Sequence, residues 1–291
     1  MISYLELADI KQNFDSDKNT SQFFFPPKGK QPFISEPYRI SSYALGLYHE
    51  GAIELIADLN SYHITDKNLI FLPSKVIREW MFTKECVINS ALFFEREFMM
   101  EQLGNTSFDK KVRFMQEDTV VHLSLSNSNY EELSKIFENV LQKSKQPSKH
   151  KQTIIAHELM TLLLQVDELF LDTNNSLHTN NFGRNQELTK AFKKLLSQYI
   201  LEQRNVGFYA EKLGVNPKHL SQTLKQETGH SATAIISKRT ILEAKVLLQD
   251  VSMSVAQVGY ALSFKNPSQF GKYFKSKTGV TPNEYRKNLP L

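Results

Sequence analysis

The chain has one cysteine, Cys86, in 291 residues, so an intramolecular disulfide is excluded and a reducing compartment is expected. No uncharged apolar run approaches the roughly 18 residues that a membrane-spanning helix needs. The first twenty residues mix acidic and basic side chains with apolar ones, which is not the pattern of a secretory signal sequence. These absences predict a cytoplasmic protein with no membrane partner.

Patterns of catalytic and metal-binding residues are also missing. Residues 1–127 contain only His49, His63 and His122, and no two histidines are separated by a single residue. The spacings of nucleophile elbows, phosphate-binding loops and zinc proteases do not occur. We therefore expect no catalytic residues, no metal and no cofactor, and we do not expect an enzyme.

A repeated phrase is present near the C-terminus. Residues 225–231 read KQETGHS, and 50 positions later residues 275–281 read KSKTGVT; Asn-Pro precedes each copy, at 216–217 and 266–267. Asn followed by Pro favours a helix start, and Thr-Gly favours a helix stop. A shorter apolar-periodic segment precedes each Asn-Pro. Two short helices joined by a tight turn form a helix-turn-helix unit, so the pattern predicts two such units.

Charge is divided between the two parts of the chain. Residues 184–291 carry 17 Lys and Arg against 7 Asp and Glu, a balance of +10, whereas residues 1–183 carry 18 against 24, a balance of −6. A basic segment with tandem helix-turn-helix patterns is the electrostatic footprint of a DNA-binding domain. The alternative is a solvated basic surface without a partner.

A denser pattern runs through the second unit and comprises Phe264, Ser268, Phe270, Phe274-Lys275, Gly279, Pro282 and Tyr285-Arg286, with Arg239, Ala244 and Leu247-Leu248 in the helix between the units. With these residues the C-terminal segment resembles the AraC family of bacterial transcription regulators. Two positions depart from the pattern. Gly259 stands where a helix alanine is usual, and Ser263 stands where a turn glycine is usual.

Each recognition helix turns its apolar residues inward, so its polar residues are expected to face DNA. Glutamine can contact adenine in a bidentate manner, and lysine can contact guanine or phosphate. The predicted DNA-binding residues are Lys218, Ser221, Gln222 and Lys225 in the first unit, and Ser268, Gln269, Lys272 and Lys275 in the second. The alternative for each is an exposed polar residue without a role.

Residues from about 20 to 115 contain short alternating segments separated by turns, which predicts a small barrel or jelly roll. Here the resemblance extends to the family's cupin-like sensor domain. Tyr48, Phe71, Trp80 and Phe93 are candidates to line an effector pocket, and ordinary core packing is the alternative for each. The missing metal ligands argue against a cupin enzyme fused to a DNA-binding domain, which is the rival interpretation.

Helical periodicity replaces the strand pattern between about 128 and 173. One heptad-like stripe comprises Ile155, Leu159, Leu162, Val166 and Leu169. It is a candidate homodimer interface, and packing against its own barrel is the alternative. The fold class is thus an α+β multidomain protein. We expect a barrel at 1–127, a helical pair at 128–173, a linker at 174–184 and a DNA-binding domain at 185–291.

Together these features predict a sequence-specific regulator that binds double-stranded DNA as a homodimer and responds to a small molecule in its barrel. The resemblance also implies activation of transcription, with RNA polymerase as a partner. A nonspecific architectural DNA-binding protein is the third interpretation.

Overall fold

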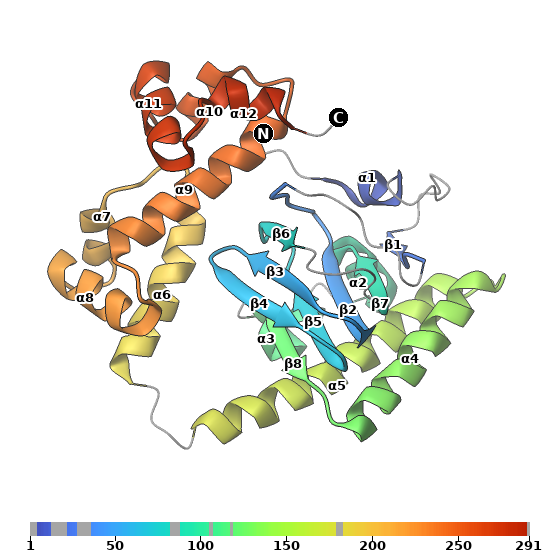
Figure 1. Ribbon diagram of the computed structural model, residues 1–291. Helices are drawn as coiled ribbons and strands as arrows, with labels where there is room; N and C mark the ends of the chain where they lie inside the picture. Colours follow the sequence, from blue (N-terminus) through green and yellow to red (C-terminus); the bar gives the residue numbers. More distant parts are fainter. Residues whose placement is uncertain are drawn as a thin grey trace. The chain divides into compact units, whose positions relative to one another are not determined.

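The computed structural model (Figure 1) describes residues 5–12, 22–27, 36–81, 88–104, 107–116, 119–178 and 183–289. Cys86, on which the expectation of a reducing compartment rests, lies outside these ranges. The chain divides into two compact units, Tyr4–Leu177 and a unit that contains His178–Leu291. Within the described ranges, no helix has both the length and the apolar composition to cross a membrane.

Two antiparallel sheets form the first unit. The larger has the order β1-β7-β2-β5-β8, and the smaller has the order β4-β3-β6. The strands are β1 (Phe23–Phe24), β2 (Tyr43–Glu50), β3 (Ile53–Ala57), β4 (Asn60–Ile64), β5 (Asn68–Leu72), β6 (Arg78–Met81), β7 (Ile88–Phe94) and β8 (Val121–Ser124). The β3–β4 hairpin turns at Asp58, which adopts φ of 53°.

The described strands do not form the closed barrel that the sequence predicted. No strand of one sheet is hydrogen-bonded to a strand of the other within the described ranges. Strand alternation fixes which residues share a face but not which strands pair at the edges, so closure was not determined by the pattern. The coarser expectation of an α+β protein, with N-terminal sheets and C-terminal helices, is confirmed.

The larger sheet is buried on both faces. One face shares an apolar cluster with α4 (Asn127–Lys145) and α5 (Lys151–His178), which lie along it in Figure 1. The other face shares a second cluster with the smaller sheet and α1 (Leu7–Gln12). Three short helical segments complete this unit: α2 (Arg96–Leu103), η1 (Phe108–Lys111) and α3 (Arg113–Gln116). The first unit is therefore layered, with helices, the five-stranded sheet and the three-stranded sheet in that order.

Helix α4 begins where the Ser126 side chain accepts a hydrogen bond from the backbone N–H of Asn129, at 3.2 Å. It ends before Pro147, which has no N–H to continue the ladder. Helix α5 continues to His178, which lies inside the segment expected to be a linker from 174. That segment contains neither Gly nor Pro before Gly183, so its polar composition alone does not stop the helix.

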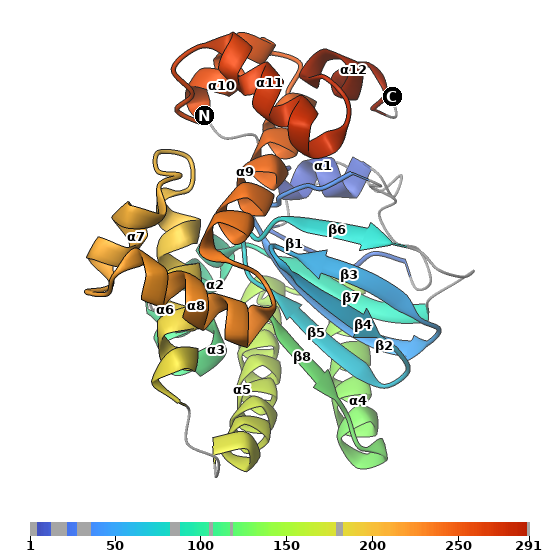
Figure 2. The same ribbon diagram turned by 60° about the vertical axis from the view of Figure 1, so that its left-hand side comes forward.

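The second unit is entirely helical in its described residues. Its helices are α6 (Arg184–Tyr199), α7 (Val206–Lys212), α8 (Pro217–Thr228), α9 (Ala232–Gln249), α10 (Val255–Ala261), α11 (Pro267–Thr278) and α12 (Pro282–Lys287). Figure 2 shows α9 running from the α7–α8 pair to the α10–α11 pair. The two pairs are the two helix-turn-helix units, and α9 is the helix that joins them.

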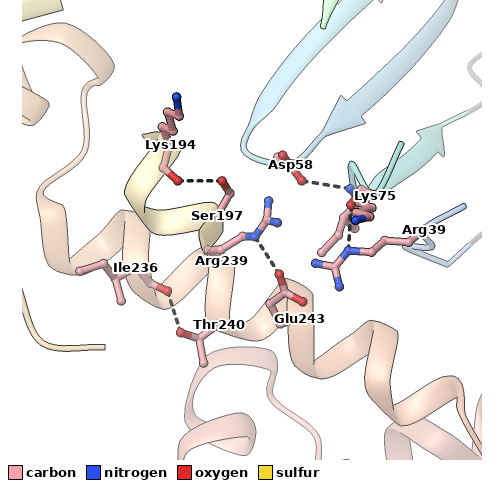
Figure 3. Close-up of polar contacts among 10 residues, drawn as sticks. Arg39, Asp58, Lys75, Lys194, Ser197, Ile236, Arg239, Thr240 and Glu243 are labelled. Carbon is pink, nitrogen blue, oxygen red and sulfur yellow. Dashed lines mark hydrogen bonds and ion pairs between the residues drawn. The ribbon is translucent and has the colours of Figure 1, made fainter. Parts of the chain in front are cut away.

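Helix α9 contains a buried ion pair along its length. Arg239 Nε donates to Glu243 Oε1 at 3.0 Å, one turn further on, and the two side chains are 6% and 1% exposed (Figure 3). In the same stretch of the helix, Thr240 Oγ1 donates to the Ile236 carbonyl at 2.8 Å. A charge buried without its partner is strongly destabilising, so Arg239 and Glu243 are a coupled structural pair.

Candidate nucleic-acid interface

The first helix-turn-helix unit is built from local capping contacts. Asn205 accepts a hydrogen bond from the Gly207 N–H at 2.8 Å and begins α7. Gly214 then takes φ of 65° in the turn, a conformation that costs glycine little. Asn216 accepts from the His219 N–H at 2.7 Å and begins α8, with Pro217 in the first helical position. The sequence prediction of this unit is matched element by element.

The second helix-turn-helix unit has the same kinds of helix caps. Ser254 forms a capping box with Gln257 and begins α10, and Asn266 accepts from the Gln269 N–H at 2.9 Å to begin α11. Both recognition helices end at a left-handed glycine, with φ of 75° at Gly229 and 84° at Gly279. Because the same caps sit at the same relative positions, α8 and α11 are equivalent helices.

The two departures from the family pattern have visible consequences. A Cβ added to Gly259 would lie 3.1 Å from Phe270 Cβ, so the glycine gives α11 room to approach α10 closely. Ser263 is held at φ of 54°, which is strained for a residue with a side chain. The turn that the family usually builds with glycine is therefore built here with serine in the same left-handed conformation.

Six of the eight predicted DNA-binding residues lie opposite the buried faces of their helices. Leu220 and Leu224 of α8, and Phe270 and Phe274 of α11, are all fully buried. The polar residues on the opposite faces repeat at intervals of four and three: Lys218, Gln222 and Lys225 in α8, and Ser268, Lys272 and Lys275 in α11, all exposed. Each set therefore forms one continuous surface row along its helix.

Ser221 and Gln269 sit at the edges of these rows, and Gln269 has a structural contact that the sequence analysis missed. Its side-chain Oε1 accepts a hydrogen bond from the Lys265 N–H at 3.3 Å. With the 50-residue offset, Gln269 corresponds to His219 and not to Gln222. His219 is exposed and was not among the predicted contacts, although the repeat, applied position by position, would have found it.

Several carboxylates of the helical unit form ion pairs or hydrogen bonds with residues of the same unit. Glu243 pairs with Arg239. A hydrogen bond from the Ser252 hydroxyl lowers the pKa of Asp250, and a backbone hydrogen bond from Thr281 lowers the pKa of Glu284. The two exposed rows themselves contain four lysines and no acidic residue, which favours contact with a phosphate backbone.

The four candidate effector residues do not share one face. Tyr48 and Phe93 belong to the apolar cluster between the two sheets, and Trp80 packs against it with its Nε1 donating to the Tyr38 hydroxyl at 3.0 Å. Phe71 instead lies in the cluster under the helices, where its ring meets that of Phe114 at 4.7 Å. Adjacent strand residues point to opposite faces, and Phe71 is on the face away from the other three.

The three histidines of the strands, which lie on β2, β4 and β8, have polar neighbours. His63 Nδ1 lies 2.6 Å from Glu54 Oε1, and His122 Nε2 lies 2.7 Å from Asn68 Oδ1. His49 Nε2 lies 2.8 Å from Ser90 Oγ. In the part of the chain that the structure describes, no three His, Cys, Asp or Glu residues gather into a group that could hold a metal ion.

The α5 stripe lies in the interior of its own chain. Ile155, Leu159, Leu162 and Val166 are at most 1% exposed within the helix–sheet cluster, and Leu169 packs against that cluster. This is the intrachain alternative for the stripe. A heptad-like pattern shows that a face is buried but does not identify the surface that buries it, so the stripe is not free to contact a second copy.

Comparison with known proteins places the chain among helix-turn-helix proteins. A family profile described as a helix-turn-helix domain matches residues 209–288. The probable transcription factor PqrA of Proteus vulgaris is 31% identical over 90 residues, which are 30% of this chain and 74% of PqrA. The arabinose operon regulatory protein of Escherichia coli is 25% identical over 154 residues, which are 53% of this chain and 50% of that protein.

Among solved structures, ToxT of Vibrio cholerae aligns with 92% of this chain and 98% of its own, at 15% identity and a TM-score of 0.42. The chain spans about half, or less, of the length of several curated relatives that it matches, the arabinose operon regulatory protein among them.

Proposed function

Because the chain belongs to the AraC family of transcription regulators, we propose that it binds specific sites on double-stranded DNA and regulates transcription from them. Its two recognition helices would enter successive major grooves on one side of the duplex, with centres about 34 Å apart. Direct contacts come from the two exposed rows. Lysines of both rows contact phosphate or guanine, and Gln222 contacts an adenine edge.

The repeated polar row is the observation that supports this proposal. Lys218, Gln222 and Lys225 occupy the same places on α8 as Ser268, Lys272 and Lys275 on α11, and all six are exposed. A solvated basic face needs no such repetition at equivalent positions of two capped helices. Two equivalent helices with different polar side chains are suited to two different subsites.

Selection of bound duplexes from a random library by the full chain tests the proposal. We expect enrichment of one site with two subsites about ten base pairs apart. Single base changes in that site should cost about 1–3 kcal/mol each in a competition assay at fixed salt. A nonspecific architectural protein would enrich no site and would not discriminate such changes, and that outcome would refute the proposal.

We infer further that the protein activates transcription, with RNA polymerase as its partner. Family membership supports this assignment. Transcription in vitro from a template that carries the selected site tests it, because an activator raises transcript yield from that template and a repressor lowers it. A template with the site scrambled is the matched control.

We also infer that a small-molecule effector binds between the two sheets of the first unit. Support comes from Tyr48, Phe93 and Trp80, which gather at one apolar cluster together with the buried hydroxyl of Tyr38. Trp80 is the only tryptophan of the chain, so its fluorescence reports on this place alone. A compound that binds here should change that emission, whereas a compound that binds elsewhere should leave it unchanged.

Self-association, if it uses α5, requires a different face from the buried stripe. Ile154 and Leu164 are 38% and 40% exposed, and at 3.6 residues per turn they lie about 80° apart around α5, both away from the buried stripe. We propose that a homodimer forms through this outer face. Two copies bound together would raise the effective concentration of the second at a neighbouring site.

A further inference from the structure

The loop between α6 and α7 reaches from one helix-turn-helix unit to the other. On the side of the first helix-turn-helix unit, the Tyr209 hydroxyl donates to the Gln203 carbonyl at 2.7 Å, and Asn205 caps α7. On the side of the second helix-turn-helix unit, Leu201 packs against the apolar cluster that contains Phe264, Phe270 and Phe274. The loop is therefore anchored at both ends, in addition to the connection through α9.

Arg204 makes the most direct contact across this junction. Its guanidinium carbon lies 3.8 Å from the centre of the Phe264 ring, and its Nη2 donates to the Ser263 carbonyl at 2.9 Å. Ser263 is the strained turn residue between α10 and α11. Arg204, which precedes α7 of the first helix-turn-helix unit, thus contacts both the backbone and the aromatic ring at the turn of the second helix-turn-helix unit.

Phe264 transmits this contact to the recognition helix. Its ring centre lies 5.4 Å from that of Phe270 and 5.3 Å from that of Tyr273, both on α11. A planar guanidinium can stack on a ring and donate hydrogen bonds in its own plane at once, which an ammonium cannot do. Arginine is therefore the cation suited to hold the turn and the ring together.

The burial of the Arg204 side chain supports a well-defined contact with Ser263 and Phe264. Arg204 is half-buried, and desolvation lowers the pKa of its guanidinium. Its Nη1 is buried and donates no hydrogen bond to the described residues. An arginine that only served solubility would extend this group into water, because exposed guanidinium groups keep their hydration.

We propose that Arg204 is a positioning residue that fixes α11 relative to α8, and thereby sets the spacing between the two DNA subsites that the protein accepts. This inference rests on the proposed DNA binding. It adds that specificity comes from the distance and rotation between the recognition helices as well as from their side chains. One inserted base pair moves a subsite by roughly 3.4 Å and rotates it by about 34–36°, so a rigid pair of helices rejects it.

Arg204→Ala in the full chain tests the inference on duplexes with the selected subsites at the selected spacing, or with one base pair inserted or removed between them. For the wild type we expect a loss of about tenfold or more on either change. For Arg204→Ala we expect weaker binding at the selected spacing and a spacing penalty reduced to about threefold or less. Unfolding curves and footprints of both subsites should stay close to those of the wild type.

Lys218→Ala is the matched control, since it removes a proposed DNA contact without touching the junction. It should weaken binding to all three duplexes alike and leave the spacing penalty unchanged. A folded Arg204→Ala protein with the full wild-type penalty would overturn the inference. Should that variant unfold, Arg204→Lys carries the same test, because lysine keeps the stem and the charge but cannot stack and donate together.

The failure of the inference can be told apart from that of the proposed function. If the wild type selects no DNA site, the proposed DNA binding and the positioning role of Arg204 are both refuted. If it selects a two-subsite duplex but tolerates an inserted base pair, DNA binding stands and the positioning role of Arg204 is refuted.

Discussion

At the scale of single residues, the two glutamines that the sequence predicts as DNA contacts have different surroundings. Gln222 belongs to the exposed row of α8, whereas Gln269 accepts a hydrogen bond from the Lys265 N–H at the start of α11. Gln222→Ala should therefore cost about 1–3 kcal/mol of DNA binding, relax one base position and leave the melting temperature unchanged. Gln269→Ala should lower the melting temperature as well, because a helix cap contributes about 1 kcal/mol.

Gln269→Glu separates the two roles of that residue. The carboxylate still accepts from the Lys265 N–H, so thermal stability should be retained. Its negative charge faces the phosphates, so DNA affinity should fall. A Gln269→Ala variant that lost affinity at unchanged stability would mean that the residue contacts DNA and does not cap the helix.

Two helix glycines of the second recognition unit also differ in their surroundings. A Cβ at Gly271 would meet nothing within 4 Å, whereas one at Gly259 would lie 3.1 Å from Phe270 Cβ. Alanine is more favourable than glycine in a helix by about 1 kcal/mol. Gly271→Ala should therefore raise the free energy of unfolding by about that amount, and Gly259→Ala by clearly less. Denaturant unfolding measures both, and an equal gain would show that Phe270 yields without cost.

At the scale of elements, the opposite faces of α5 should respond differently to a charge. Leu162 is 1% exposed and Leu164 is 40% exposed. Leu162→Glu buries a carboxylate in the helix–sheet cluster and should destabilise the first unit by about 3 kcal/mol or more. Leu164→Glu should leave the melting temperature of the subunit unchanged and convert a homodimer into monomers.

Sedimentation and thermal melting of the two variants decide between the faces. A folded Leu164→Glu protein that sediments as the wild type would remove the outer face of α5 from any interface. A folded, monomeric Leu162→Glu protein would restore the inner stripe as the interface, against its burial in the described core.

Elements whose boundaries depend on nearby residues were predictable from the sequence, and those that depend on distant partners were not. Asn216-Pro217 and Gly229 define α8 almost alone, so the helix-turn-helix units follow from the repeat. The pairing of β5 with β8 joins Asn68 to Ser124, and no local signal specifies it. The side of the sheet to which Phe71 points, and the surface that covers Leu162, depend on long-range packing of this kind. The exposed polar rows of α8 and α11 could be predicted from the repeat, whereas the hydrogen bond that Gln269 accepts from the Lys265 N–H could not, because a polar residue next to a helix start is compatible with either role.

At the scale of the whole molecule, the charge division predicts that residues 184–291 bind DNA without the rest of the chain. This fragment carries a balance of +10. Its affinity should fall roughly a thousandfold between 50 and 200 mM salt if about six phosphates are contacted. The slope of log affinity against log salt should decrease by about 1 for each of Lys272→Ala and Lys275→Ala. Protection of a single groove by the fragment would contradict the tandem arrangement.

The side-chain caps of the helical unit also affect how fast it folds during synthesis. Each helix from α7 to α12 begins at a residue whose side chain accepts a hydrogen bond from a backbone N–H two or three positions later. The sheets of the first unit instead pair strands far apart in the chain, such as Phe23 with Phe94. Folding rates decrease as contacts become less local. During synthesis the first unit leaves the ribosome earlier, yet the helical unit behind it should complete its fold sooner after emerging.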